Sequence, residues 1–313
     1  MFDQSAQRVE PWLSIQERIE QQDWPKPALY VVATPIGNLA DLTPRARYAL
    51  ELADVIAAED TRSSRPLLQA WGIHTPLIAA HRHNERQVTE DVLDRLQAGE
   101  RVALISDAGA PAISDPGGQL VQDIKAAGFR VVSLPGASAC ITALMSVGAT
   151  TDERPWFVFL GFPPARSAAR LKMLERWKDF EGAVVMYEAP HRLDALLRDM
   201  NVTFESSRDV SLARELTKRF EEVVTLPLAG ALAWLKDDMH REQGEYVVIV
   251  HPDRARVDSQ DADDSQWQSA DRQAWMGALT ESLSTRDASK VMAKALGVPK
   301  DVCYRELLRF LGK

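Results

Sequence analysis

Residues 29–39 read Leu29-Tyr30-Val31-Val32-Ala33-Thr34-Pro35-Ile36-Gly37-Asn38-Leu39. The first five residues form an uninterrupted apolar run, which is typical of a parallel strand that is buried on both faces. Proline and glycine follow the run directly and mark a turn. This stretch therefore predicts the first strand and loop of a βα unit, and the fold class depends on whether the pattern recurs.

The pattern recurs through the first half of the chain. We expect strands over 54–58, 101–106 and 130–134 and helices over 43–53, 84–97, 117–127 and 137–147. Short apolar strands that alternate with amphipathic helices indicate an α/β fold with a mostly parallel sheet.

The second half follows a different pattern. We expect strands over 156–161, 183–187, 209–213, 220–226 and 245–250, and helices over 166–178, 190–199 and 228–236. The last two strands leave little room for long crossovers, which parallel neighbours would need, so we expect a mixed sheet. We place the boundary between the two α/β lobes near residue 150, within 148–152.

The two ends of the chain differ from these lobes. A short helical pattern in the N-terminal region ends at Pro25-Lys26-Pro27. Near the other end, an acidic linker is followed by helices over 272–283 and 286–311. The spacing around Gly297 fits either a helix-turn-helix or a plain helical hairpin. The predicted divisions are an extension (1–27), an N-terminal lobe (28–150), a C-terminal lobe (151–252), a linker (253–271) and a helical segment (272–313), which is a candidate for binding a partner.

Composition restricts the class of protein. The chain has 313 residues, of which 45% are hydrophobic and 26% charged, as in an ordinary globular protein of about two domains. Cys140 and Cys303 form no CxxC pair, which argues against a disulfide scaffold and fits a cytoplasmic protein. No signal-peptide core and no apolar run of about 18 residues is present, so we expect no membrane segment.

The charge distribution permits a nucleic-acid partner without requiring one. The net charge is −8, which is unfavourable for contact with phosphate. Residues 286–313, however, hold seven basic and three acidic side chains, a local balance of +4. From charge alone, a solvated helix face is the better explanation of this balance, and RNA binding by the segment is the alternative.

The loops that follow the strands are the candidate binding elements, because ligands of open α/β sheets bind beyond the carboxyl ends of the strands. Four such loops in the first half contain glycine, proline or charged residues: 34–39, 59–62, 107–118 and 135–139. No GxGxxG, GxxxxGK[ST], GxSxG or HExxH motif is present. His81 and His83 could bind a metal, but a solvated or core role is more common for such a pair alone, so we predict no metal.

The second half adds a charged cluster after the strand 183–187. Glu188, His191 and Arg192 place a carboxylate, an imidazole and a guanidinium within five residues. Such a cluster fits acid–base catalysis. It also fits an ordinary helix start, because a carboxylate favours the N-terminal dipole and Pro190 suits the first turn.

In this order, the loops resemble the tetrapyrrole-methylase superfamily of S-adenosylmethionine-dependent methyltransferases. More narrowly, they resemble members that 2′-O-methylate a cytidine of small-subunit (16S) ribosomal RNA. The resemblance covers about residues 28–252. Its motifs lie at 34–41, 58–62, 83–85, 106–109, 115–117, 134–136, 191–192 and 213–218.

The resemblance implies two α/β lobes with S-adenosyl-L-methionine in the cleft between them, a homodimer, and 16S rRNA or the small ribosomal subunit as partner. The positions that match the family's cofactor site are Pro35, Asp107, Ala108, Gly109, Ala110, Ile113, Ser138, Ala139, Tyr187 and Ala213. Ala110 stands where the family commonly has threonine, so we expect backbone rather than side-chain contacts there.

Methyl transfer to a ribose hydroxyl needs alignment and a positioned base. The candidate bases are Glu188, Glu59 and Glu85, and the candidate phosphate ligands are Arg62, Arg192 and Lys218. We favour Glu188 with Arg192. Two other functions stay open, namely methylation of a small tetrapyrrole and a non-enzymatic role as an RNA-binding assembly factor; the motifs at 58–62 and 83–85 favour RNA.

Overall fold

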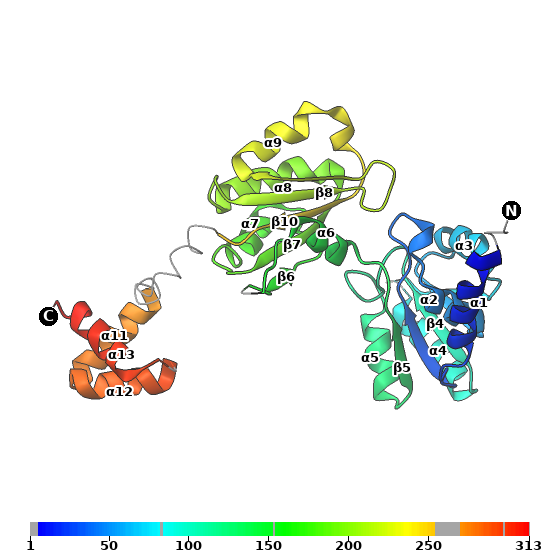
Figure 1. The fold of residues 1–313 in the computed structure, drawn as a ribbon, viewed down its shortest axis with the longest axis horizontal. Helices are drawn as coiled ribbons and strands as arrows, with labels where there is room; N and C mark the ends of the chain where they lie inside the picture. The colour runs from blue at the N-terminus through cyan, green and yellow to red at the C-terminus, as the bar shows by residue number, and fades with distance from the viewer. Residues whose placement is uncertain (1–5, 82–83, 153, 254–269, 297, 313) are drawn as a thin grey trace. The chain divides into compact units, whose positions relative to one another are not determined.

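The computed structural model describes residues 6–81, 84–152, 154–253, 270–296 and 298–312. Internal contacts divide the chain into two compact units, residues 1–252 and residues 253–313. Within the described residues, no helix is both long and apolar enough to cross a membrane. The first unit contains two sheets, and the elements described in the second are all helices (Figure 1).

The first sheet is entirely parallel, as the sequence predicts, with strand order β3-β2-β4-β1-β5. Its strands are β1 (Ala28–Val32), β2 (Val55–Ala58), β3 (Leu77–Ala79), β4 (Arg101–Ile105) and β5 (Arg130–Leu134). Its helices are α2 (Pro44–Leu52), α3 (Thr61–Ala70), α4 (Glu85–Gln97) and α5 (Gly118–Ala126), and η1 (Leu39–Asp41) is a 3-10 turn. Both faces are apolar: Tyr30 packs toward α2, whereas Leu29 packs toward α4 and α5.

The second sheet is mixed, as predicted, with strand order β6-β7-β10-β8-β9. Its strands are β6 (Phe157–Phe159), β7 (Ala183–Glu188), β8 (Asp209–Arg214), β9 (Glu222–Pro227) and β10 (Tyr246–Val250). Only β6 and β7 are parallel neighbours, and the other pairs are antiparallel. The helical elements are α7 (Ser167–Glu175), α8 (Pro190–Thr203), α9 (Leu228–Asp237) and the 3-10 turn η2 (Met239–Glu242).

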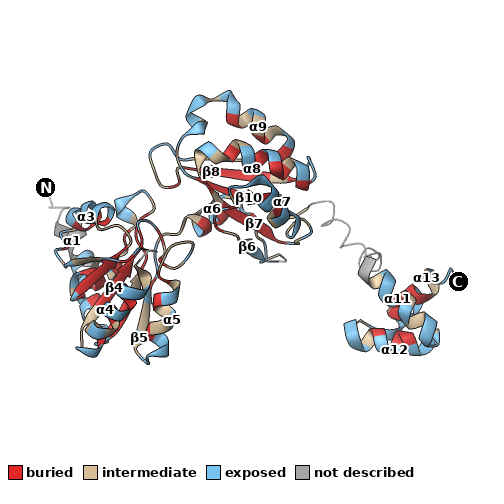
Figure 2. Cartoon of the chain, turned by 180° about the vertical axis from the view of Figure 1, so that it is seen from behind, coloured by how far each residue is buried: buried red, intermediate tan, exposed pale blue. Residues whose placement is uncertain are grey.

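The two faces of the second sheet have different cores. Met186 and Val248 belong to the core beneath α7, α8 and α9. Val185 and Val247 point to the other face, where they pack with α6 (Ala139–Val147). Although α6 follows β5 in the chain, it covers the second sheet, and Figure 2 shows buried residues on both sides of that sheet. The chain therefore reaches the second lobe before the boundary expected near residue 150.

The remaining helices flank these lobes. Helix α1 (Ala6–Glu20) packs on α2. The second unit holds α11 (Ala270–Ser282), α12 (Thr285–Leu296) and α13 (Lys300–Phe310) around Met276, Met292 and Leu307. The helix expected over 286–311 is thus two helices, and Gly297 between them lies outside the described residues, as does 254–269 of the predicted linker.

Two elements were not predicted from the sequence. Helix α3 contains Pro66, which removes a backbone hydrogen-bond donor. Because proline is normally read as the end of a helix, the sequence did not predict a helix here. Strand β3 has only three residues and no fully buried side chain, so it shows no periodicity.

Candidate active site

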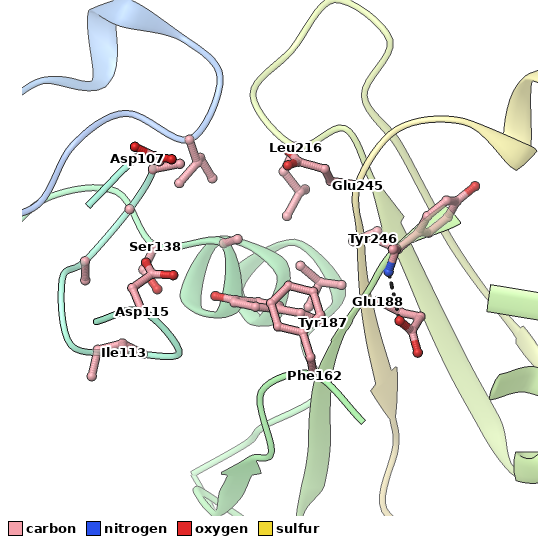
Figure 3. A pocket seen from close by; sticks show the side chains of 18 of the residues that line it. Asp107, Ile113, Asp115, Ser138, Phe162, Tyr187, Glu188, Leu216, Glu245 and Tyr246 are labelled. Carbon is pink, nitrogen blue, oxygen red and sulfur yellow. Dashed lines mark hydrogen bonds between the residues drawn. The ribbon is translucent and has the colours of Figure 1, made fainter. Parts of the chain in front are cut away.

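A cavity of about 640 Å³ lies between the two lobes of the first unit. Residues from the loops after β1, β2 and β4 line one side, and residues at the ends of β7 and β8 line the other (Figure 3). The carboxyl ends of the parallel strands therefore meet at the cavity, as the sequence predicts. The volume is in the range of small-molecule sites.

The loops after β1 and β4 are joined at the cavity wall. The amide of Thr34 donates to the carbonyl of Gly109 (2.9 Å), and the amide of Gly109 donates back (3.0 Å). Gly109 has φ = +80°, a left-handed conformation that glycine adopts readily. A Cβ atom there would lie 3.4 Å from Cγ2 of Ile36 and would fill part of the wall. Gly109 therefore lets backbone atoms approach a ligand.

The loop after β4 continues in a strained conformation. Ala112 (φ = 68°) and Ser114 (φ = 69°) are both left-handed without being glycine. Each costs on the order of 1–3 kcal/mol, and such residues gather at functional sites. The hydroxyl of Ser114 would lie 2.7 Å from a Cβ atom on Gly161, so this loop reaches the second lobe. The strain places Ile113 at the cavity.

Carboxylates give the first-lobe side of the cavity negative charge. Glu59, Asp107 and Asp115 all line it. Asp107 also accepts hydrogen bonds from the amide of Asp60 (3.1 Å) and from the hydroxyl of Ser63, which attaches the loop after β4 to the start of α3. These charges favour a cationic ligand.

Tyr187 forms the wall beside α6. Its hydroxyl accepts from the amide of Cys140 (3.0 Å) at the first turn of α6. Its ring packs edge-on against Phe159 and Phe162, with centroids 4.7 and 5.5 Å away. Burial raises the pKa of the Tyr187 hydroxyl, so it is a neutral hydrogen-bonding group at physiological pH.

Glu188 and Arg192, the favoured catalytic pair, contact one another at the start of α8. Side chains alternate along a strand, so Glu188 points to the α8 side of β7, opposite Tyr187 (Figure 3). The Glu188 carboxylate accepts from the amide of Ala189 (2.9 Å) and pairs with Arg192 Nε (3.1 Å). The Arg192 guanidinium also donates to the carbonyl of Pro163.

The surroundings of Glu188 are those of a helix anchor. Its side chain is fully buried, and burial raises the pKa of the carboxyl, although the hydrogen bond from Ala189 and the charge of Arg192 oppose that shift. The contacts are those of the helix-start interpretation. The catalytic assignment of Glu188 and Arg192 stays a prediction.

Lys218 lines the cavity and extends from the second lobe to the first. Its ammonium donates to Glu215 (2.8 Å) and to Glu245 (2.7 Å). A Cβ atom on Gly37 would lie only 2.5 Å from Lys218 Cγ, so the lysine stem packs directly on the loop after β1. Burial lowers the pKa of Lys218, but the two carboxylates outweigh it and raise the pKa overall. Lys218 is therefore a cation rather than a base.

Most predicted site residues lie together. Those that line the cavity are Glu59, Asp107, Ala108, Gly109, Ala110, Ile113, Ser138, Ala139, Tyr187, Glu188 and Ala213. Pro35 and Arg192 do not line it, whereas their neighbours Ile36 and His191 do. Glu85 instead accepts from the amide of Gly117 (3.2 Å), and Arg62 pairs with Asp60 (2.8 Å). His83 lies outside the described residues, and the described ones contain no cluster of three or more metal-ligand side chains.

Several lining residues were missed: Ile36, Asp115, Phe162, Leu216 and Glu245. Ile36, Asp115 and Leu216 lie within the motifs but were not singled out. Glu245 directly precedes β10, which runs antiparallel to β7 and β8, so its amino-terminal end meets their carboxyl ends. A search of carboxyl ends alone therefore overlooks it.

The family model of the Tetrapyrrole (Corrin/Porphyrin) Methylases matches residues 28–232. The chain belongs to this family. It is 42% identical over 293 residues to a protein of Pseudomonas aeruginosa named ribosomal RNA small subunit methyltransferase I, covering 91% of this chain and 98% of that protein. A protein of the same name from Escherichia coli O157:H7 is 42% identical over 284 residues, covering 91% and 96%.

Solved structures of tetrapyrrole methylases share the two-lobed fold of this family member. Cobalt precorrin-4 methyltransferase superposes with a TM-score of 0.55 at 14% identity, covering 72% of this chain and 94% of that one. Uroporphyrin-III C-methyl transferase from Thermus thermophilus, complexed with S-adenyl homocysteine, gives 0.53 at 16% identity, covering 74% and 99%. The two-lobed α/β architecture predicted from the sequence is confirmed.

Proposed function

We propose that this family member transfers a methyl group from S-adenosyl-L-methionine to the 2′-hydroxyl of a cytidine ribose in 16S ribosomal RNA. The observation that carries the proposal is the 42% identity to relatives named ribosomal RNA small subunit methyltransferase I across 91% of the chain. The aligned part covers 91% of this chain and 98% and 96% of the two relatives, so the likeness is not confined to one lobe. A ribosomal substrate also makes the cytoplasm the expected location.

The cavity fits the methyl donor in size, shape and charge. When bound, S-adenosylmethionine supplies an electrophilic methyl group on a positively charged sulfur. The loop from Asp107 to Ile113 would hold its amino-acid end, where Gly109 leaves the backbone accessible. The carboxylates of Glu59 and Asp115 complement its positive charge. Tyr187 and Ala213 would contact the remainder of the donor.

Among the predicted bases, we favour Glu59 for the proton of the ribose hydroxyl. Glu59 lines the cavity, and its side chain is only partly buried. Glu188 faces α8 and holds the start of that helix, so we assign it a positioning role. A protonated ribose hydroxyl is a poor nucleophile, and a carboxylate within reach would accept its proton during methyl transfer.

Two further features concern the partners. Ile141 and Met145 are exposed one turn apart on α6, which supports the expected homodimer. Light scattering should then give twice the 34.9 kDa chain mass.

The basic segment 286–313 supports an RNA contact in addition to the one at the cavity. Removal of residues 269–313 should weaken RNA binding in a filter assay, and an unchanged affinity would exclude that contact.

The proposed function is tested by transfer of radiolabelled methyl from S-adenosylmethionine to small ribosomal subunits that lack the modification, followed by nuclease mapping. Label on a single cytidine ribose is the expected result. Cofactor binding without labelled RNA, together with labelling of a tetrapyrrole, would assign the chain to small-molecule methylation instead. Loss of cofactor binding altogether would overturn the enzymatic assignment.

A further inference from the structure

Arginine side chains lie over aromatic rings at four places in the described residues. Three of these pairs have buried or half-buried members and contribute to packing. The fourth, Arg219 over Phe220 with 5.5 Å from the guanidinium carbon to the ring centroid, is different because both residues are exposed. Phe220 has 65% of its surface exposed.

The Arg219–Phe220 pair lies at the rim of the proposed active site. It belongs to the loop between β8 and β9, and Leu216 and Lys218 of the same loop line the cavity. The stem of Lys218 packs on Gly37 of the first lobe, so this loop reaches from the second lobe to the first beside the cavity. A base that contacted Phe220 would therefore bind two residues along the chain from Lys218, which lines the cavity.

The backbone of this loop is held firmly. Buried Arg214 donates to the carbonyls of Phe220 (3.4 Å) and Gln243 (2.7 Å). Glu215 (φ = 50°) and Thr217 (φ = 67°) adopt the left-handed conformation without being glycine. Strain of this kind persists only when the surroundings determine the conformation, and it gathers at functional sites. The phenyl ring of Phe220 is therefore exposed to solvent on a backbone that is fixed in place.

The pairing of Arg219 differs from that of the other arginine on an aromatic ring at this lobe's surface. The cavity contains Glu59, Asp107 and Asp115, whereas no described carboxylate forms an ion pair with Arg219. The comparable Arg241, which lies 4.2 Å from the Trp234 ring centroid, is neutralised by Glu222 (2.9 Å). Although Glu221 and Glu222 follow in the chain, no described ion pair holds the Arg219 guanidinium, which can therefore contact a phosphate or a base.

We propose that Phe220 and Arg219 form a stacking platform for an unpaired RNA base beside the methylated ribose. Proteins recognise single-stranded RNA by stacking splayed bases on aromatic rings and on arginine planes, and basic side chains contact the phosphates. Phe220 supplies the ring, and Arg219 supplies the plane and the charge. This inference rests on the proposed RNA substrate and adds a residue that positions it.

The test compares Phe220→Ala and Phe220→Trp with the wild-type protein, using small subunits that lack the modification. Steady-state methylation gives kcat and the KM for subunits, and calorimetry gives the Kd for S-adenosylmethionine. Met239→Ala is the matched control, because Met239 is also a large exposed apolar side chain of the same lobe (74%, against 65% for Phe220) but lies in η2, outside the β8–β9 loop.

We expect Phe220→Ala to raise the KM for subunits roughly 30-fold, which is the middle of the range for one stacked base. The Kd for cofactor should be unchanged, and Phe220→Trp and Met239→Ala should keep the wild-type KM. An unchanged KM in Phe220→Ala, or weakened cofactor binding in that variant, would overturn the platform while leaving the proposed function intact. A wild-type protein that methylates no RNA would overturn both.

Discussion

The two lobes that form the cavity differ in strand direction, and this difference decides which site residues can be found in the sequence. In the first lobe every strand is parallel, so the loops after β1, β2 and β4 converge at one edge. In the second lobe β10 runs against β7 and β8, and Glu245 reaches the site from the opposite end of its strand. Strand direction must be known before such a residue can be assigned.

The lobes also differ in what they bury. Within residues 1–252, all the described charged side chains that are buried belong to the second lobe: Arg170, Glu188, Asp199, Arg208 and Arg214. In the first lobe the buried polar residues are uncharged. The second lobe therefore buries charged groups that ion pairs or backbone carbonyls must satisfy, whereas the buried groups of the first lobe need no charged partner.

The largest expected effect concerns the buried ion pair of the second lobe. Arg170 donates to Asp199 from Nε (2.7 Å), and Asp199 is the only carboxylate paired with it among the described residues. Asp199→Ala leaves a buried cation and should lower the free energy of unfolding by about 3–5 kcal/mol, measured by denaturant titration. Asp194→Ala removes exposed pairs with Arg198 and Lys236 and should cost less than about 1 kcal/mol. Equal losses would show that the buried pair of the second lobe contributes no more to stability than an exposed pair on the same helix.

The second prediction asks which lobe supplies the base. Glu59→Gln should lower kcat on the order of 100-fold or more, because the carboxylate in the cavity is lost as a proton acceptor. Glu188→Gln should lower kcat by less than about tenfold, because this carboxylate anchors α8. Both are measured by single-turnover methyl transfer at saturating cofactor. The reverse ranking would restore Glu188 as the base and transfer the catalytic role to the second lobe.

The smallest expected effect concerns the parallel lobe alone. Gly109 (φ = +80°) and Gly128 (φ = +85°) are both left-handed, but an added Cβ atom would have neighbours within 4 Å only at Gly109. Both Gly→Ala variants should lose about 1 kcal/mol of stability. Only Gly109→Ala should raise the Kd for S-adenosylmethionine, on the order of tenfold, in calorimetry. A similar rise in Gly128→Ala would show that general destabilisation, not the cavity wall, sets the affinity.

Much of the first lobe could be predicted from the sequence because its information is local. The apolar run 29–33 predicts a buried strand, and the Pro35–Gly37 loop predicts a turn at the end of the strand where ligands bind. Neither prediction needs any other part of the chain. The same reasoning located Asp107 and Gly109, which do line the cavity. It failed for α3 and β3, where Pro66 and a length of three residues conceal the periodicity.

By itself, the sequence determined the α/β alternation, the mixed second sheet and the motifs of the cavity, because periodicity, turn residues and connection lengths are properties of neighbouring residues. Only the tertiary structure decided that Glu188 faces α8, that α6 covers the second sheet, and that Lys218 meets Gly37 and Glu245. These contacts join segments far apart in the chain. Their partners depend on how whole strands and helices pack, which local patterns do not encode.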